Sequence, residues 1–133
     1  MTDETNDEPE FTPFWEHLGR GEIAFPRCLD CGRHHWYPKA LCPWCQSTRI
    51  EWTPVTGAAE LYSWTVVRHA FTAEYQDKIP YTVALVEFPD APGVRLLTNL
   101  SPDDTTWRGG MALKPTIEAA DEGKRPKVVF SAA

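Results

Sequence analysis

The chain has 133 residues, enough for one domain of ordinary size or a small domain with an appended module, and too few for two large domains. Hydrophobic residues make up 42% and charged residues 24%, which supports a buried core and excludes a fully disordered chain. Twelve Pro against eight Gly, with six Trp and six Phe, favour strands and turns over an all-helical bundle.

The net charge of -6 is concentrated at the N-terminus. Residues 1–10 hold five of the 19 acidic residues and no Lys or Arg, which leaves 14 acidic against 13 basic residues in a nearly neutral body. We expect these ten residues to form a disordered acidic leader. They lack the features of a secretion signal, and the chain has no run of about 18 apolar residues. A soluble, cytoplasmic protein with no membrane association is therefore expected.

A short helix is predicted next, from Thr12 as N-cap through Pro13 at its first position to Gly19 at its C-terminal end. Phe14 and Leu18 would share one face of this helix. Two turns that carry so much apolar surface are unstable alone in water. The apolar face must therefore dock, either on the chain's own ribbon or on a partner.

The four cysteines form two Cys-x-x-Cys knuckles, and the predicted metal ligands are Cys28, Cys31, Cys42 and Cys45. Each short turn aims two sulfurs at one point, the arrangement that a tetrahedral ion prefers. Four protein ligands close the site, so the expected Zn²⁺ would be structural. Iron is an alternative metal for this ligand set. Disulfides or free thiols are less favoured because the chain has no secretion signal, and a redox motif is less favoured because no βαβ pattern surrounds the cysteines.

The residues next to the two knuckles are expected to have structural roles and not to bind the metal. Gly32 follows the first knuckle, where a left-handed backbone is often needed. His34 and His35 are expected on the ribbon surface, because four cysteines already complete a coordination shell. Three aromatic residues are expected to pack over the ribbon, which is too small to bury a core without them: Trp36, Tyr37 and Trp44.

The remaining sequence reads as strands. After a turn-rich joint at Pro54 to Gly57, strands are predicted at residues 60–69, 81–88, 94–100, 111–118 and 127–131, with a turn at 89–93. Five short strands suit a small antiparallel barrel of the OB type. Pro115 indicates an edge position or a bulge in the fourth of these strands.

Two stretches are expected to be irregular loops. Ala70 to Pro80 is longer than a hairpin needs, and such loops often carry binding function; it contains Phe71, Tyr75 and Lys78. In the second loop, residues 105–110, Trp107 is expected to lie in the core or over the end of the barrel.

These motifs, in this order, resemble a family of small bacterial and archaeal proteins with a rubredoxin-like zinc ribbon followed by an OB-fold, long catalogued as a domain of unknown function. The matching segments are the two knuckles, GAAELYSWT at residues 57–65, PYTVA at 80–84 and Gly109-Gly110. The resemblance covers roughly residues 11–130. Many zinc ribbons share the knuckles, whereas their order with PYTVA is more specific.

The resemblance implies an accessory role beside a thiolase-fold enzyme. Members of the family accompany acetoacetyl-CoA thiolase with hydroxymethylglutaryl-CoA synthase, or thiolase-like retro-aldolases that shorten CoA-linked sterol side chains, sometimes with a hydratase. This chain would then shape the interface and help to hold an acyl-CoA, in lipid or steroid metabolism. No catalytic residue carries over onto it, and no CoA-binding residue can be named.

Together these observations predict a mainly β protein: a short N-terminal helical segment, a rubredoxin-like zinc ribbon and a C-terminal five-stranded OB-fold barrel. The expected boundaries are a leader at 1–10, the helical segment at 11–24, the ribbon at 25–54 and the OB-fold at 55–133.

Other functions are weighed against this one. Residues 20–49 carry five basic and two acidic residues, a surplus of +3 that suits CoA phosphates or an acidic partner, or that merely keeps the ribbon soluble. A nucleic-acid-binding module is disfavoured because the body is nearly neutral, whereas a surface that binds phosphates needs a basic surplus. An independent enzyme is the least favoured reading, because no acid-base motif is present. A free-standing acyl-CoA carrier lies between these alternatives.

Overall fold

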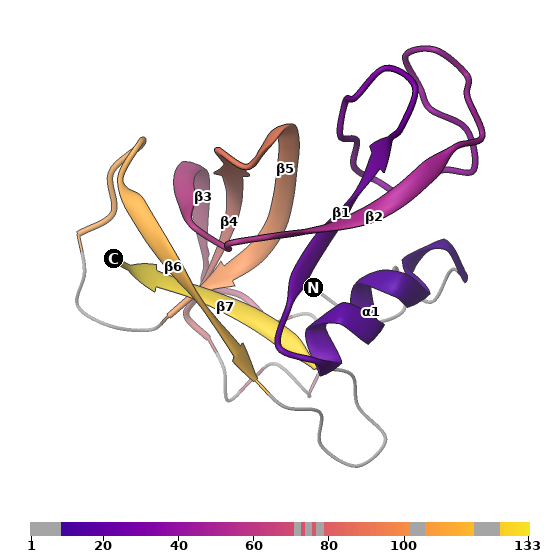
Figure 1. Cartoon of the computed structure of the whole chain (residues 1–133). Helices are drawn as coiled ribbons and strands as arrows, with labels where there is room; N and C mark the ends of the chain where they lie inside the picture. Colours follow the sequence, from indigo (N-terminus) through magenta and orange to yellow (C-terminus); the bar gives the residue numbers. More distant parts are fainter. Residues whose placement is uncertain (1–8, 71–72, 74–75, 77–78, 102–105, 119–125) are drawn as a thin grey trace.

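The computed structural model describes residues 9–70, 73, 76, 79–101, 106–118 and 126–133. Over these residues it contains a 3-10 turn (Pro9–Phe11), one short α-helix, a two-stranded ribbon and a closed five-stranded barrel, so the predicted fold class is confirmed (Figure 1). Most of the predicted acidic leader, residues 1–8, lies outside the described residues. No helix in the described part is long and apolar enough to cross a bilayer.

Helix α1 (Thr12–Gly19) occupies the predicted range and ends at Gly19 as predicted, but the predicted N-cap is wrong. Phe11 is the N-cap and no side chain caps the helix, because Thr12 is itself helical. Gly19 is helical too, and the chain reverses two residues later at Gly21, whose φ of +82° is one that glycine adopts without strain.

The apolar face of α1 docks on the chain itself. Phe14 and Leu18 are buried, and the Phe14 ring centroid lies 5.1 Å from that of Trp36 and 6.3 Å from that of Phe25. Of the two expected docking partners, the chain's own ribbon is therefore the one found, and the helix covers part of the core.

The ribbon consists of β1 (Ile23–Cys28) and β2 (Ile50–Val55), which pair antiparallel from Ile23 opposite Val55 to Cys28 opposite Ile50. These two strands were not among those predicted. Every β1 residue except Arg27 is buried, so β1 is a core strand although its sheet has only two members. The knuckles follow at the far end of the ribbon, away from the barrel (Figure 1).

The barrel has the strand order β3-β4-β5-β7-β6 and closes between β3 and β6. Its strands are β3 (Ala59–Val67), β4 (Tyr81–Phe88), β5 (Ala91–Leu100), β6 (Ala112–Glu118) and β7 (Lys127–Ala132). All five predicted strands are present, with ends that shift by a few residues. The predicted antiparallel pairing holds except between β5 and β7, which pair in parallel.

One chain of aromatic rings connects the helix, the ribbon and the barrel. Phe25 of β1 lies 4.9 Å from Phe88 of β4, and Phe88 lies 5.9 Å from Phe130 of β7, measured between ring centroids. Trp107 packs partly buried against the same cluster, as predicted. The ribbon and the barrel therefore share a single hydrophobic core, which neither could complete alone.

The joint between the ribbon and the barrel is fixed by short-range contacts. Gly57 has a φ of +89°, and a Cβ there would stand 2.8 Å from Cγ of Pro115, so only glycine fits. The Thr56 hydroxyl and N–H donate to Asp90 Oδ2 at 2.7 and 3.1 Å. The joint that was predicted to start at Pro54 begins later, because Pro54 still belongs to β2.

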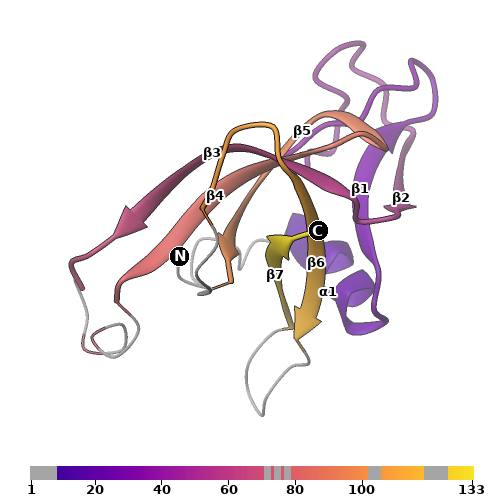
Figure 2. The ribbon, with the colours of Figure 1, turned by 90° about the vertical axis from the view of Figure 1, so that its left-hand side faces the viewer.

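The hairpin of β3 and β4 extends beyond the barrel. A bulge interrupts the register of β3 between Leu61 and Ser63. Three large apolar side chains are exposed, Tyr62 in the bulge and Trp64 and Val66 after it. Figure 2 shows β3 and β4 running out together on the side away from β1 and β2. The predicted loop residues Phe71, Tyr75 and Lys78 lie outside the described residues.

Candidate metal centre

The four cysteines come together at the far end of the ribbon. Their Sγ atoms all lie within 4.8 Å of one another, with Cys28 and Cys45 at 3.5 Å and Cys31 and Cys42 at 3.6 Å. A tetrahedron with Zn–S bonds of about 2.3 Å separates its sulfurs by about 3.8 Å, whereas a disulfide needs about 2.05 Å. The cysteines are free and the cage has the size of a four-sulfur metal site.

Backbone amides point at the sulfurs within each knuckle. The N–H of Cys31 donates to Cys28 Sγ at 3.5 Å, and the N–H of Trp44 donates to Cys42 Sγ at 3.4 Å. Such hydrogen bonds stabilise thiolates and orient them before any ion binds.

The two knuckles are built alike. The N–H of Gly32 donates to the Cys28 carbonyl and that of Gln46 to the Cys42 carbonyl, both at 2.9 Å. Gly32 has a φ of +78° and Gln46 a φ of +63°, so both knuckles need a left-handed residue directly after their second cysteine. The prediction for Gly32 is confirmed. The same requirement at Gln46 was missed, although the spacing from Cys42 repeats that of Gly32 from Cys28.

The pKa values of the thiols show how crowded the cluster is. The N–H of Cys31 is the main cause that lowers the pKa of Cys28 to about 6. A backbone N–H at Ser47 acts to lower the pKa of Cys45, but the neighbouring sulfurs, Cys28 first, and burial outweigh it and raise this pKa to about 12. The chemistry of this donor set therefore suits a divalent cation, whose charge would allow all four sulfurs to ionise together.

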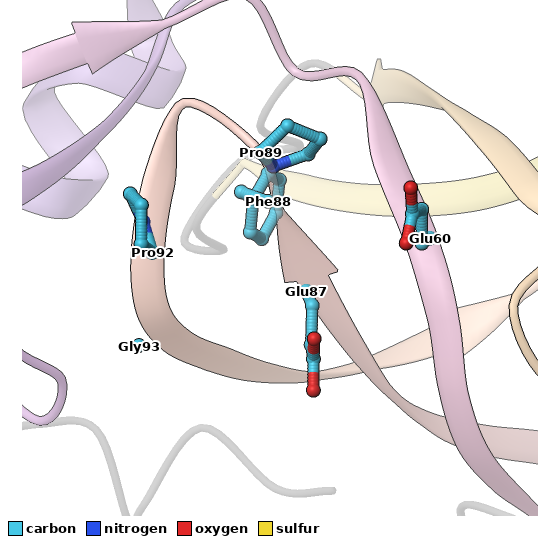
Figure 3. A pocket seen from close by; sticks show the side chains of 6 residues that line it. All are labelled: Glu60, Glu87, Phe88, Pro89, Pro92 and Gly93. Carbon is cyan, nitrogen blue, oxygen red and sulfur yellow. The ribbon is translucent and has the colours of Figure 1, made fainter.

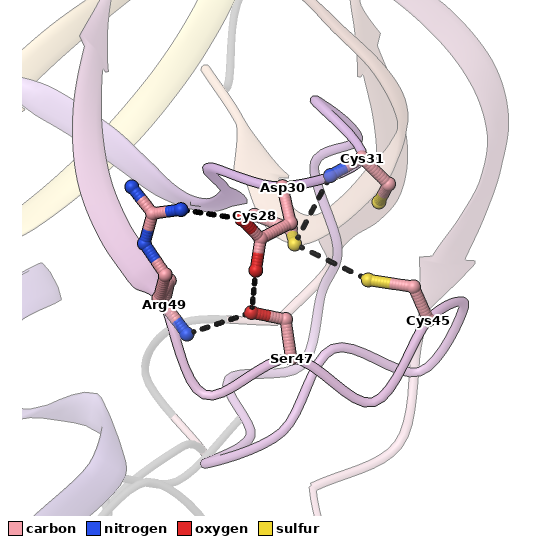
Figure 4. A network of polar contacts seen from close by, with 6 residues as sticks. All are labelled: Cys28, Asp30, Cys31, Cys45, Ser47 and Arg49. Atoms are coloured by element: carbon pink, nitrogen blue, oxygen red, sulfur yellow. Dashed lines mark hydrogen bonds and ion pairs between the residues drawn. The ribbon is translucent and has the colours of Figure 1, made fainter.

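A polar network braces the two knuckles (Figure 4). Asp30, inside the first knuckle, accepts hydrogen bonds from the Ser47 hydroxyl and from Nη1 of Arg49, which both follow the second knuckle. The Arg49 N–H also donates to Ser47 Oγ at 3.0 Å. The Ser47 hydroxyl and then the Arg49 guanidinium hold the pKa of Asp30 below its ordinary value. The brace ties the loops together independently of a metal.

The histidines beside the cluster differ from their prediction. His35 is only 5% exposed, so its expected place on the surface is wrong, and His34 is half-buried. Within the described residues, neither ring nitrogen of His35 has a hydrogen-bond partner. Burial is the main cause that lowers the pKa of both imidazoles, which favours their neutral forms. Neither histidine belongs to the sulfur cluster.

The three aromatic residues assigned to the ribbon have different surroundings. Trp36 packs against the core as predicted, and the ring of Tyr37 lies 5.7 Å from it while staying largely exposed. Trp44 is 60% exposed, so its predicted packing is wrong. The guanidinium carbon of Arg33 lies 5.1 Å from the centroid of the Trp44 ring.

Ion pairs neutralise only two of the five basic residues in the stretch 20–49. Arg49 pairs with Asp30, and Arg20 with Glu22 at 3.6 Å, which uses both acidic residues of this stretch. Among the described residues the other three cations form no ion pair: Arg27, Arg33 and Lys39.

The barrel carries a hollow of about 320 Å³ between β3, β4 and the start of β5 (Figure 3). Its charged lining residues, Glu60 and Glu87, are cross-strand partners on β3 and β4. Glu87 is already engaged by Nε of Arg95 at 3.1 Å. The six lining residues include no histidine, cysteine or serine, so the hollow offers no nucleophile or general base of the usual kinds beyond these carboxylates.

The fold and the sulfur cluster thus define a protein with an N-terminal zinc ribbon and a C-terminal OB-fold barrel. Comparison with protein families finds the same two parts: the ChsH2 rubredoxin-like zinc ribbon domain matches residues 15–51, and the ChsH2 C-terminal OB-fold domain matches residues 52–118. The chain belongs to the ChsH2 family, relatives of which are also named DUF35 proteins. The resemblance noted from the sequence is confirmed.

Individual relatives agree with this assignment. The chain is 29% identical over 82 residues to a DUF35 domain-containing scaffold protein of Methanothermobacter thermautotrophicus, a match that covers 60% of this chain and 61% of that protein. It is similar to a chain of the Ltp2-ChsH2(DUF35) aldolase, with 27% identity, a TM-score of 0.79 and coverage of 94% of this chain and 95% of that one. A DUF35 protein of unknown function from Sulfolobus solfataricus shares the fold, with 20% identity, coverage of 98% and 92%, and a TM-score of 0.67.

Proposed function

We propose that this chain is a non-catalytic accessory subunit of a thiolase-like enzyme that acts on CoA thioesters. The observation that carries the proposal is the similarity, over 94% of the chain, to a chain of the Ltp2-ChsH2(DUF35) aldolase. The scaffold role in the name of the archaeal relative supports it as well. A retro-aldolase of sterol side-chain degradation is the favoured partner, and a thiolase is the alternative.

The chemistry would belong to the partner. The described residues bring no nucleophile, base and acid together in a cavity, and the sulfur cluster offers four ligands without an open position. This chain would shape the interface and help to hold the acyl-CoA there. A hydratase is the second partner that the family resemblance implies, and no membrane or nucleic acid is needed for this role.

Within this function, Cys28, Cys31, Cys42 and Cys45 would hold a structural Zn²⁺. The ion would fix the knuckles and supply folding energy. Elemental analysis of the purified protein tests this: one zinc per chain is expected, whereas one iron per chain, with the visible absorption of a ferric tetrathiolate, would contradict the choice of metal.

Co-expression with a thiolase-like subunit from the same organism tests the accessory role. Co-elution in size-exclusion chromatography, with CoA-thioester cleavage that depends on both chains, is the expected result. A chain that elutes alone and leaves the cleavage rate unchanged would contradict the proposal. If such a chain binds acyl-CoA by itself, it is a free-standing carrier.

A further inference from the structure

The knuckles expose large apolar side chains directly beside the predicted metal ligands. Leu29 follows Cys28, Leu41 precedes Cys42 and Trp44 precedes Cys45. Leu29 is 46%, Leu41 48% and Trp44 60% exposed. Because the four sulfurs lie within 4.8 Å, the backbone brings these side chains to one end of the ribbon. We call Leu29, Arg33, Leu41 and Trp44 the ribbon tip.

The exposure of these side chains contrasts with the residues between the two knuckles. There the chain buries His35 and packs Trp36 against the core, so large side chains of this region can be buried. Exposed apolar surface rimmed by polar residues commonly marks an interaction site. Trp and Arg are moreover the side chains most enriched among residues that dominate binding energy.

The charge around the tip points to the kind of partner. Arg33 lies over the Trp44 ring, and Arg27, Arg33 and Lys39 lack acidic partners among the described residues. Asp30, the acidic residue of the first knuckle, is already bound by Ser47 and Arg49. Arg33 therefore places an unpaired positive charge beside the exposed aromatic and aliphatic groups of the tip, an arrangement complementary to an acidic surface with apolar contacts.

The tip is also ordered before binding. Two amide-to-carbonyl hydrogen bonds of 2.9 Å close the knuckles, and the Asp30–Ser47–Arg49 network holds one knuckle to the other. A surface fixed in this way loses little conformational entropy when a partner docks.

We propose that the ribbon tip is the surface through which this chain binds an acidic face of its enzyme subunit. The inference rests on the proposed function, since it names the contact within that complex. A second copy of the chain fits less well, because a twofold interface would set the positive tip against itself. Nucleic acid fits less well because the body as a whole is nearly neutral, whereas a surface that tracks phosphates needs a large basic surplus.

Affinity measurements on the full-length, zinc-loaded chain and the purified thiolase-like subunit test the proposal. Trp44→Ala and Arg33→Glu are each expected to weaken binding at least about tenfold. The matched control is Trp64→Ala, which removes an exposed tryptophan from the barrel hairpin and should change the affinity less than about threefold. Wild-type affinity should fall between about 50 and about 300 mM salt.

Zinc content and melting temperature separate lost binding from lost folding. If Trp44→Ala loses zinc, the affinity of Arg33→Glu still tests the proposal. The knuckle uses the backbone carbonyl of Arg33, which accepts from the Cys28 N–H, and the residue itself is exposed. Wild-type affinity retained by both variants would overturn the proposal and leave the accessory function standing. Weakening by Trp64→Ala alone would move the interface to the hairpin and likewise overturn it.

Two further outcomes go against the proposal in different ways. If the wild-type chain does not bind the subunit, the proposed function fails and this inference falls with it. If the chain alone binds free CoA or a single-stranded oligonucleotide and Trp44→Ala abolishes that binding, the tip is a ligand site and the protein-docking role is overturned.

Discussion

Replacing Phe25 by alanine should cost more stability than any surface change, because this ring joins the ribbon to the barrel. Phe25 is fully buried, and its ring lies 4.9 Å from Phe88, 5.3 Å from Trp36 and 6.3 Å from Phe14. Buried Phe-to-Ala changes cost about 3–5 kcal/mol, and large planar neighbours from three elements cannot collapse easily into the space. We expect a loss of about 4 kcal/mol, a large share of the roughly 5–15 kcal/mol that stabilises a typical domain.

Urea unfolding with excess zinc, followed by far-UV circular dichroism and tryptophan fluorescence, measures this loss. The wild-type chain should unfold in one transition, because the two parts share a core. Val66→Ala, on an exposed strand position, is the control and should stay within about 0.5 kcal/mol of wild type. A loss below about 1 kcal/mol for Phe25→Ala would refute the view that the ribbon and the barrel are stabilised together.

Three further changes test the metal centre and the joint. Cys42→Ser should abolish stoichiometric zinc in elemental analysis and remove the rise in melting temperature on zinc addition; zinc retained at one per chain would contradict the proposed ligand set. Both Gly32 and Gln46 have a positive φ, which glycine adopts without strain. In urea titrations Gly32→Ala should therefore lower the free energy of unfolding by about 1 kcal/mol, and Gln46→Gly should raise it by about the same amount. A change of the same sign in both variants would contradict this reasoning. The Thr56 hydroxyl and then its N–H lower the pKa of Asp90, so the stability that Asp90 contributes is present above its ordinary pKa of 3.8 and is lost as the pH falls through the folded-state pKa. Asp90→Asn should therefore be less stable than wild type near neutral pH, and a difference that persists unchanged well below pH 3.8 would contradict the reasoning.

The features that could be predicted from the sequence are those determined by residues close together along the chain. The knuckles were predictable because a Cys-x-x-Cys turn aims its sulfurs by local geometry alone. The strand Tyr81–Phe88 was predicted at its observed bounds, since aromatic, β-branched and other apolar residues fill a full strand length. Helix α1 was also found at its predicted range, although its capping was not.

Features that depend on distant partners were missed. β1 is short and contains Pro26, and its burial comes from barrel residues such as Phe88 that lie far along the chain. The burial of His35 likewise could not be read from neighbours in sequence. For the polar brace a signal existed, because Asp30 inside one knuckle and Ser47-x-Arg49 after the other are complementary in chemistry.

The ring contacts between Phe25, Phe88 and Phe130 also bear on how the nascent chain folds. The ribosome synthesises α1 and β1 well before β7. The apolar faces of α1 and β1 therefore stay exposed until β7 has been synthesised. The knuckles need no such delay, since residues 28–49 contain every group of the sulfur cluster and its brace. We expect metal capture to precede closure of the barrel, so that a shortage of zinc during translation would leave the aromatic segment exposed to aggregation.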